Sequence, residues 1–264
     1  PITSLKILMV AGLFLLKDNN NHIITPTSKD IVVANDLTTG INFIDNNNET
    51  IVKRNNNNQY INIFDNYINV VASYLNLVKN EVKIYENNNN LYPQYKFVME
   101  INSIDIVNKS SIYKIYYNQI EESKKDEQKL SMIGIMLFDN KTYNIKVFSE
   151  LEDDEQEIKV IIYEHTFDNR VEISKEFEID EYEYEYKVFV NNKKQLEVSF
   201  EVEDSEIQLK IKTNTNKYEY NIKLIEQTNN EIILMLKIDH FEFKLTIQIL
   251  NDTFEYVYEQ LNTI

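Results

Sequence analysis

The chain has no cysteine and no tryptophan, and its 264 residues include only three glycines and three prolines. Without cysteine there is no disulfide, no thiol nucleophile and no cysteine metal ligand. The glycines are too scattered to write a G-x-G-x-x-G or a P-loop motif. These absences exclude the common nucleotide-binding loops. They leave the cell compartment open, because a core large enough to need no disulfide suits the cytosol and the outside alike.

Positive charge is also scarce. The formal net charge is −16, and Arg54 and Arg170 are the only arginines. Binding to nucleic acid or to anionic lipid depends on clustered lysine and arginine. We therefore expect no nucleic-acid partner.

Residue patterns typical of catalytic and metal-binding sites are equally scarce. The histidines His22, His165 and His240 lie far apart and show no H-x-x-H or H-E-x-x-H spacing. No serine is flanked by the glycines of a nucleophile elbow. The acidic run at residues 150–157 lacks the glycine and the alternating oxygen ligands of a calcium loop, and a hairpin turn explains it better. The sequence predicts no catalytic residues, no metal site, no cofactor and no enzyme activity.

What the chain does have is alternation. Between residues 157 and 258, apolar and charged residues alternate and short Asn, Asp or Lys turns interrupt them; Tyr182, Tyr184 and Tyr186 alternate with Glu183 and Glu185. Because side chains of a strand point to opposite faces in turn, the pattern predicts antiparallel strands with one apolar and one charged face. Further strand candidates precede this region at residues 95–101, 111–117, 132–138, 142–148, 158–163 and 171–179.

Charges on the outer face suggest pairing across strands. Glu197 and Glu201 precede a predicted strand that carries Lys210 and Lys212. Opposite charges that face each other across strands stabilise a sheet by roughly 0.2–1 kcal/mol per pair. About a dozen strands in total predict a sheet that curls or closes.

One segment has helical periodicity. Apolar residues step by three and four from Ile61 through Phe64, Ile68 and Val71 to Tyr85, and polar residues gather opposite them. This spacing predicts a long amphipathic helix over residues 60–86 that covers the apolar face of the sheet.

The predicted fold class is α+β and mostly β: a large curved antiparallel β-meander, half-barrel or barrel-like, packed on the long helix. Residues 59–264 form this single domain, and residues 1–58 are an apolar N-terminal segment plus an Asn-rich linker. The apolar residues 5–16 are shorter than the roughly 20 residues a membrane-spanning helix needs. Three interpretations of this segment remain open: a buried or docking helix, a remnant of an export or anchoring segment, and an interfacial membrane anchor.

Tyrosine is unusually abundant, with 18 residues. The candidate ligand-binding residues are Tyr67, Tyr74, Tyr182, Tyr184 and Tyr186. If helix and sheet enclose a cavity, their hydroxyl groups are its polar contacts; the alternative is plain core packing.

The order of these segments carries a resemblance. An apolar N-terminal segment, an Asn-rich spacer and the amphipathic helix precede the stretches LSMIGIMLFDNKTYNIKVFSELEDDEQEIKV and EIDEYEYEYKVFV. The pattern resembles uncharacterised surface lipoproteins of low-GC, wall-less bacteria. It implies display outside the cytoplasm, with a cytoplasmic location as the alternative, and no known catalytic activity. This chain departs from those proteins because it has no lipobox cysteine.

The leading hypothesis is therefore a non-enzymatic extracytoplasmic surface or binding protein, with a protein or an apolar ligand as its partner. One alternative is a carrier of a lipid-like ligand held between helix and curved sheet, by analogy with half-barrel lipid carriers. Another is a self-assembling structural subunit, because open sheet edges pair readily. A hydrolase is a further alternative and needs His165 or His240 beside an acid and a nucleophile. The oligomeric state stays open.

Overall fold

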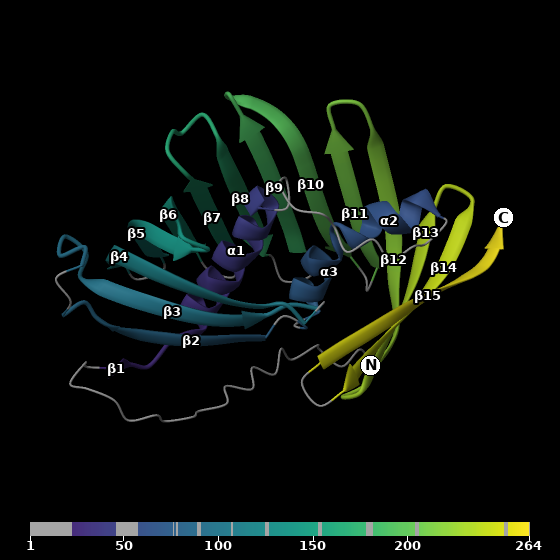
Figure 1. Cartoon of the computed structure of the whole chain (residues 1–264), viewed down its shortest axis with the longest axis horizontal. Coiled ribbons are helices and arrows are strands. Elements are labelled where there is room, and N and C mark those ends of the chain that lie inside the picture. The colour runs from purple at the N-terminus through teal and green to yellow at the C-terminus, as the bar shows by residue number, and fades with distance from the viewer. Residues whose placement is uncertain are drawn as a thin grey trace.

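The structure is a computed structural model that describes residues 23–45, 58–75, 77, 79–88, 91–106, 108–124, 127–152, 155–177, 182–203, 206–250 and 253–263. In this part of the chain, fifteen strands form one antiparallel sheet, each pairing with its neighbours in sequence (Figure 1). The first eight are β1 (Ile23–Ile24), β2 (Lys79–Glu86), β3 (Phe97–Ile104), β4 (Ser110–Lys124), β5 (Glu127–Phe138), β6 (Lys141–Glu152), β7 (Glu155–Tyr163) and β8 (Arg170–Phe177). The others are β9 (Tyr182–Val190), β10 (Lys193–Glu203), β11 (Glu206–Thr213), β12 (Lys217–Gln227), β13 (Glu231–Ile238), β14 (Phe241–Leu250) and β15 (Thr253–Thr263). The predicted antiparallel meander is confirmed.

Three helices lie in the hollow of the curved sheet: α1 (Ser28–Asp45), α2 (Gln59–Asp65) and α3 (Ile68–Tyr74) (Figure 1). Their apolar side chains and the inward-facing side chains of the strands belong to one continuous core cluster. We call the sheet face toward the helices the concave face and the other the convex face. Since strand residues alternate in direction, each strand residue of this core places its two neighbours on the convex face.

The tight turns follow from their residues. The backbone has positive φ at Asp139, Asn140, Asn191, Asn192 and Asp239, each in a short connection between adjacent strands. Asn and Asp tolerate this left-handed conformation better than other side chains, and two-residue hairpin turns require it. These residues therefore fix the register of the hairpins.

The sheet is open, with β1 and β15 as its outermost strands. It curls far enough for the turn between β3 and β4 to reach β15. The Asn108 amide donates to the Phe254 carbonyl oxygen (2.9 Å), and the Phe254 N–H donates to Asn108 Oδ1 (2.8 Å). Asn108 thereby occupies backbone groups that an edge strand otherwise offers to another chain.

The single long helix predicted over residues 60–86 is wrong. The chain forms two short helices, α2 and α3, which are separated at Asn66 and Tyr67, and residues 79–86 form strand β2. The sequence KNEVKIYE of β2 alternates in polarity as a strand does. Over so short a stretch, the same apolar positions also fit the spacing of a helix. Pairing with β3 along all eight residues decides in favour of the strand.

The segment predicted to be an Asn-rich linker contains α1. A capping box begins this helix: the Thr27 N–H donates to Asp30 Oδ2 (2.7 Å), and the Asp30 N–H donates to Thr27 Oγ1 (3.3 Å). Leu37 and Ile41 are fully buried in the common core, so α1 is part of the sheet domain. The apolar residues 5–16 lie outside the described residues. None of the described helices has the length and hydropathy that crossing a bilayer requires.

Opposite charges pair on the convex face as the sequence predicts. Lys210 Nζ lies 2.9 Å from Glu201 Oε1, and Lys212 Nζ lies 2.5 Å from Glu197 Oε1. Lys194 is a second partner of Glu197. Hydrogen bonds from Lys194 and Lys212 lower the pKa of Glu197 from 4.5 to about 2.

This lowered pKa predicts a specific loss of stability in acid. A carboxylate whose pKa is lower in the folded state stabilises the fold above its unfolded pKa. We expect the contribution of Glu197 to be complete above pH 4.5 and lost as the pH falls to about 2. Urea unfolding in pH steps should show a flatter acid limb for Glu197→Gln than for the wild type. The exposed Glu255→Gln on β15 is the control, and parallel curves for all three proteins would contradict the prediction.

We expect an added methyl group to lower the stability of the fold by different amounts at Gly134 and Gly40. A Cβ at Gly134 meets the backbone carbonyl oxygen of Tyr116, whereas a Cβ at Gly40 meets the terminal methyl groups of Ile162 (2.7 Å) and Ile173 (2.8 Å). Side-chain ends rotate away more easily than backbone moves, and alanine favours a helix over glycine by about 1 kcal/mol. We expect Gly134→Ala to lower the free energy of unfolding by about 1–3 kcal/mol. Gly40→Ala should cost less, and the reverse order in urea denaturation would contradict the packing described.

Candidate functional site

Large apolar side chains are exposed together on the convex face of β4, β5 and β6. The exposed fractions are 65% for Ile120, 52% for Ile133 and 44% for Phe148. Apolar residues scattered singly over a surface need no explanation, whereas a group of them marks an interaction site. This group therefore defines the candidate site.

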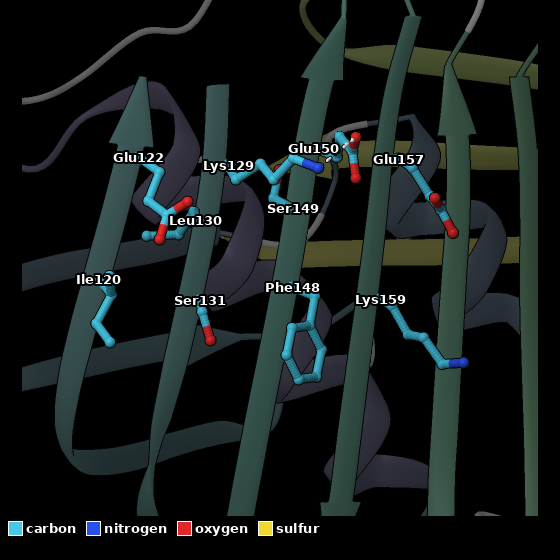
Figure 2. A pocket seen from close by; sticks show the side chains of 10 residues that line it. All are labelled: Ile120, Glu122, Lys129, Leu130, Ser131, Phe148, Ser149, Glu150, Glu157 and Lys159. Atoms are coloured by element: carbon cyan, nitrogen blue, oxygen red, sulfur yellow. Dashed lines mark ion pairs between the residues drawn. The ribbon is translucent and has the colours of Figure 1, made fainter. Parts of the chain in front are cut away.

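The register of four strands brings the site together. Ile120 of β4 faces Ser131 of β5, Ser131 faces Phe148 of β6, and Phe148 faces Lys159 of β7. A second row runs beside the first. Its members, on the same four strands, are Glu122, Lys129, Glu150 and Glu157. Figure 2 shows these two rows side by side on the convex face, with the helices behind the sheet.

Together the two rows line a shallow groove of about 280 Å³, with Leu130 and Ser149 between them. Its volume lies near the lower end of ligand-binding pockets, about 300–1,000 Å³. Lys129 Nζ lies 3.0 Å from Glu150 Oε1 across the middle of the second row. The groove thus combines an apolar floor at Ile120 and Phe148 with a charged rim.

The segment between β2 and β3 covers the neighbouring part of the convex face. The ring of Tyr92 lies 4.9 Å from that of Tyr116, and the Asn118 amide donates to the Gln94 carbonyl oxygen (3.0 Å). Val98, Tyr116 and Ile135 form a small second core beneath this segment. The cover ends at Asn118, and the next outward residue of β4 is the exposed Ile120.

The predicted ligand-binding tyrosines of β9 lie elsewhere, on the concave face beneath α1. The Tyr184 hydroxyl donates to Asp36 Oδ1 (3.1 Å), and the Tyr186 hydroxyl donates to the Tyr184 oxygen. Lys175 of β8 forms an ion pair with the same Asp36 oxygen, and its ammonium group lies 4.4 Å from the centre of the Tyr184 ring. Tyr182 stacks beside Tyr184 with ring centres 6.1 Å apart.

The cluster of Asp36, Lys175, Tyr184 and Tyr186 is almost sealed from water. The side chain of Asp36 is 1% exposed and that of Lys175 is 8% exposed. Burial raises the pKa of Asp36, while the ammonium of Lys175 and the hydroxyl of Tyr184 act in the opposite direction. Burial and the nearby Asp36 carboxyl raise the pKa of Tyr184 well above its usual value. The cluster therefore consists of the Asp36–Lys175 ion pair joined to two phenols whose pKa is raised by burial.

The space beside this cluster is small. A cavity of about 30 Å³ is lined by Asn35, Asp36, Val70, Lys175, Tyr182, Tyr184 and Phe200. A single water needs about 10–15 Å³, so the cavity suits water rather than an acyl chain. The second carboxylate oxygen of Asp36, Oδ2, is buried and has no hydrogen-bond partner among the described residues.

The other two predicted tyrosines come from the helical segment rather than from β9. Tyr67 lies between α2 and α3, where burial and the nearby Tyr218 raise its pKa. Tyr74 is the last residue of α3, and its side chain lies outside the described residues. The structure thus brings Tyr182, Tyr184 and Tyr186 together and leaves Tyr67 apart from them.

The described histidines do not converge on a nucleophile. His165 is exposed 4.0 Å from Glu164, and the ring of His240 lies 4.1 Å from that of Phe241 in a turn. Within the described ranges, no three His, Cys, Asp or Glu side chains gather closely enough to hold a metal ion. His22 lies outside those ranges. Asp153 and Asp154 of the acidic run also lie outside them.

The groove residues were not among the residues that the sequence predicts as a site. Ile120 and Phe148 point to the opposite face from Tyr117 and Val147, the buried residues nearest to each along its strand. Apolar residues at positions where the alternation calls for polar ones are the signal that identifies them. Their proximity, however, depends on the pairing of β4, β5 and β6.

Comparison with known proteins adds no relative. No family model, no curated protein and no solved structure matches the chain.

The buried ion pair predicts a non-additive stability effect. Lys175→Met leaves the Asp36 carboxylate in the core without its cation, which should lower the free energy of unfolding by about 3–5 kcal/mol. Replacing both charges, in Asp36→Leu with Lys175→Met, removes the unpaired charge and should cost less than Lys175→Met alone. Guanidinium unfolding of the two single variants and the double variant measures this coupling. A double variant whose cost equals the sum of the single costs would contradict it.

Proposed function

We propose that the protein is a non-enzymatic binding protein of the cell surface, and that it holds a protein partner in the groove on the convex face of β4–β7. The observation that carries the proposal is the joint exposure of Ile120, Ile133 and Phe148 on neighbouring strands of the convex face. Burying such side chains supplies most of the energy of a protein interface. The surface location rests on the sequence resemblance alone.

The layout of the groove suits a polypeptide. Its apolar floor runs across three strands, from Ile120 on β4 to Phe148 on β6, and is flanked by charged side chains. Protein interfaces commonly have an apolar centre with a polar rim that closes around it. Because the groove is shallow, it suits a chain segment that lies over the sheet better than it suits an enclosed small molecule.

The carrier of a lipid-like ligand has less support. It requires an apolar cavity between helices and sheet, and the cavity beneath α1 and α3 measures about 30 Å³. Ligand pockets usually measure about 300–1,000 Å³. The hydroxyl groups of Tyr184 and Tyr186 form hydrogen bonds with Asp36 and with each other.

A groove variant tests the proposal. A phage-displayed library of random peptides is selected on the immobilised full chain, and the affinities of the enriched peptides are measured by fluorescence anisotropy. In the variant Ile120→Ser with Phe148→Ser we expect the affinity to fall at least about tenfold, because both apolar contacts are lost. Both residues are exposed, so the fold should persist, and circular dichroism and thermal unfolding check this.

The matched control is Val257→Ser on β15. Val257 is 64% exposed and points to the convex face, but it is ten strands away from β5 in the order of the sheet. Binding that survives the groove variant, or that falls equally with Val257→Ser, would refute the groove as the binding surface.

A further inference from the structure

A row of glutamates crosses the convex face beside the groove. Each member directly faces the next across adjacent strands from β6 to β10, and we call them the glutamate row: Glu150, Glu157, Glu176, Glu183 and Glu201. Adjacent strands lie about 4.8 Å apart, so the row spans about 19 Å. Like charges that face each other directly across strands destabilise a sheet.

Described lysines pair with both end members of the row. Glu150 pairs with Lys129 (3.0 Å) and Glu201 pairs with Lys210 (2.9 Å). Within the described residues, neither Glu157 nor Glu176 makes an ion pair. Farther along the sheet, Lys210 and Lys212 pair with glutamates of the neighbouring strand, so Glu157 and Glu176 differ from the charged residues there.

The glutamate row and the groove form one continuous surface. Glu150 and Glu157 belong to the row and also line the groove, and Phe148 lies two residues from Glu150 on β6. The groove lining contains two lysines: Lys129 pairs with Glu150, whereas Lys159 does not. With a net charge of −16 for the chain, the surface as a whole attracts cations.

We infer that the partner is a basic polypeptide segment whose apolar side chains enter the groove between Ile120 and Phe148 while its lysines or arginines lie along the glutamate row. This inference rests on the proposed function and names the chemical class of the partner. Cations of the partner relieve the repulsion between facing glutamates, and its apolar side chains cover the exposed floor. A bound metal ion fits less well, because no three acidic side chains of the described residues gather into a metal site.

Three labelled peptides of equal length test the inference with the full chain. One alternates lysine with leucine, the second replaces lysine with glutamate, and the third replaces lysine with serine. Fluorescence anisotropy should show tight binding of the lysine peptide, weak binding of the serine peptide and none of the glutamate peptide. In Glu157→Gln with Glu176→Gln, the affinity for the lysine peptide should fall about tenfold, and higher salt should reduce the difference.

The control variant is Glu255→Gln with Glu259→Gln, which removes the same charge from the exposed face of β15 and should change the affinity less than about twofold. If the serine peptide binds as tightly as the lysine peptide and Ile120→Ser with Phe148→Ser abolishes both, the basic partner is refuted while the proposed function stands. If no peptide depends on Ile120 and Phe148, both fail. Saturable calcium binding that the Glu157 and Glu176 changes remove, without peptide binding, also overturns the inference.

Discussion

The rest of the structure depends on the burial of one face of a single open sheet. The three helices and the inward side chains of the strands make one core, and alternation sends the other half of each strand to the convex face. No described helix covers the convex face (Figure 1), and the segment of residues 91–96 covers a small part near β4 and β5. Most outward side chains are therefore in contact with water. A group of exposed apolar side chains such as Ile120, Ile133 and Phe148 is for this reason a candidate interaction site.

Charge is distributed differently inside and outside this sheet. Inside, Asp36 and Lys175 form an ion pair beneath α1, beside a cavity of about 30 Å³. Outside, glutamates and lysines alternate over β10–β12, whereas glutamates face glutamates over β6–β10. The repulsion within the glutamate row is a cost to the free protein that a cationic partner relieves. The proposal therefore places the binding partner on the convex face.

Local patterns predict the strands well and the contacts between distant strands poorly. Period-two alternation identifies β9 from Tyr182 to Val190, and the Asn and Asp turns identify its hairpins. The same reasoning fails over residues 60–86, because eight residues of β2 fit both periods and only pairing with β3 decides between them. The capping box at Thr27 and Asp30 is readable in the sequence and marks the start of α1. The groove is not readable in this way, because Ile120 and Phe148 meet only through two strand registers.

The central claim is that the convex face of β4–β10 is the binding surface, and hydrogen–deuterium exchange of the full chain with and without the lysine–leucine peptide tests it most directly. The account predicts that slowed exchange is confined to β4–β10 and includes the amides around Ile120, Phe148 and Glu157. Backbone amides of α1 around Asp36, and those of β11–β15, should exchange at unchanged rates. Protection centred on α1, or protection spread evenly over the whole sheet, would contradict the account.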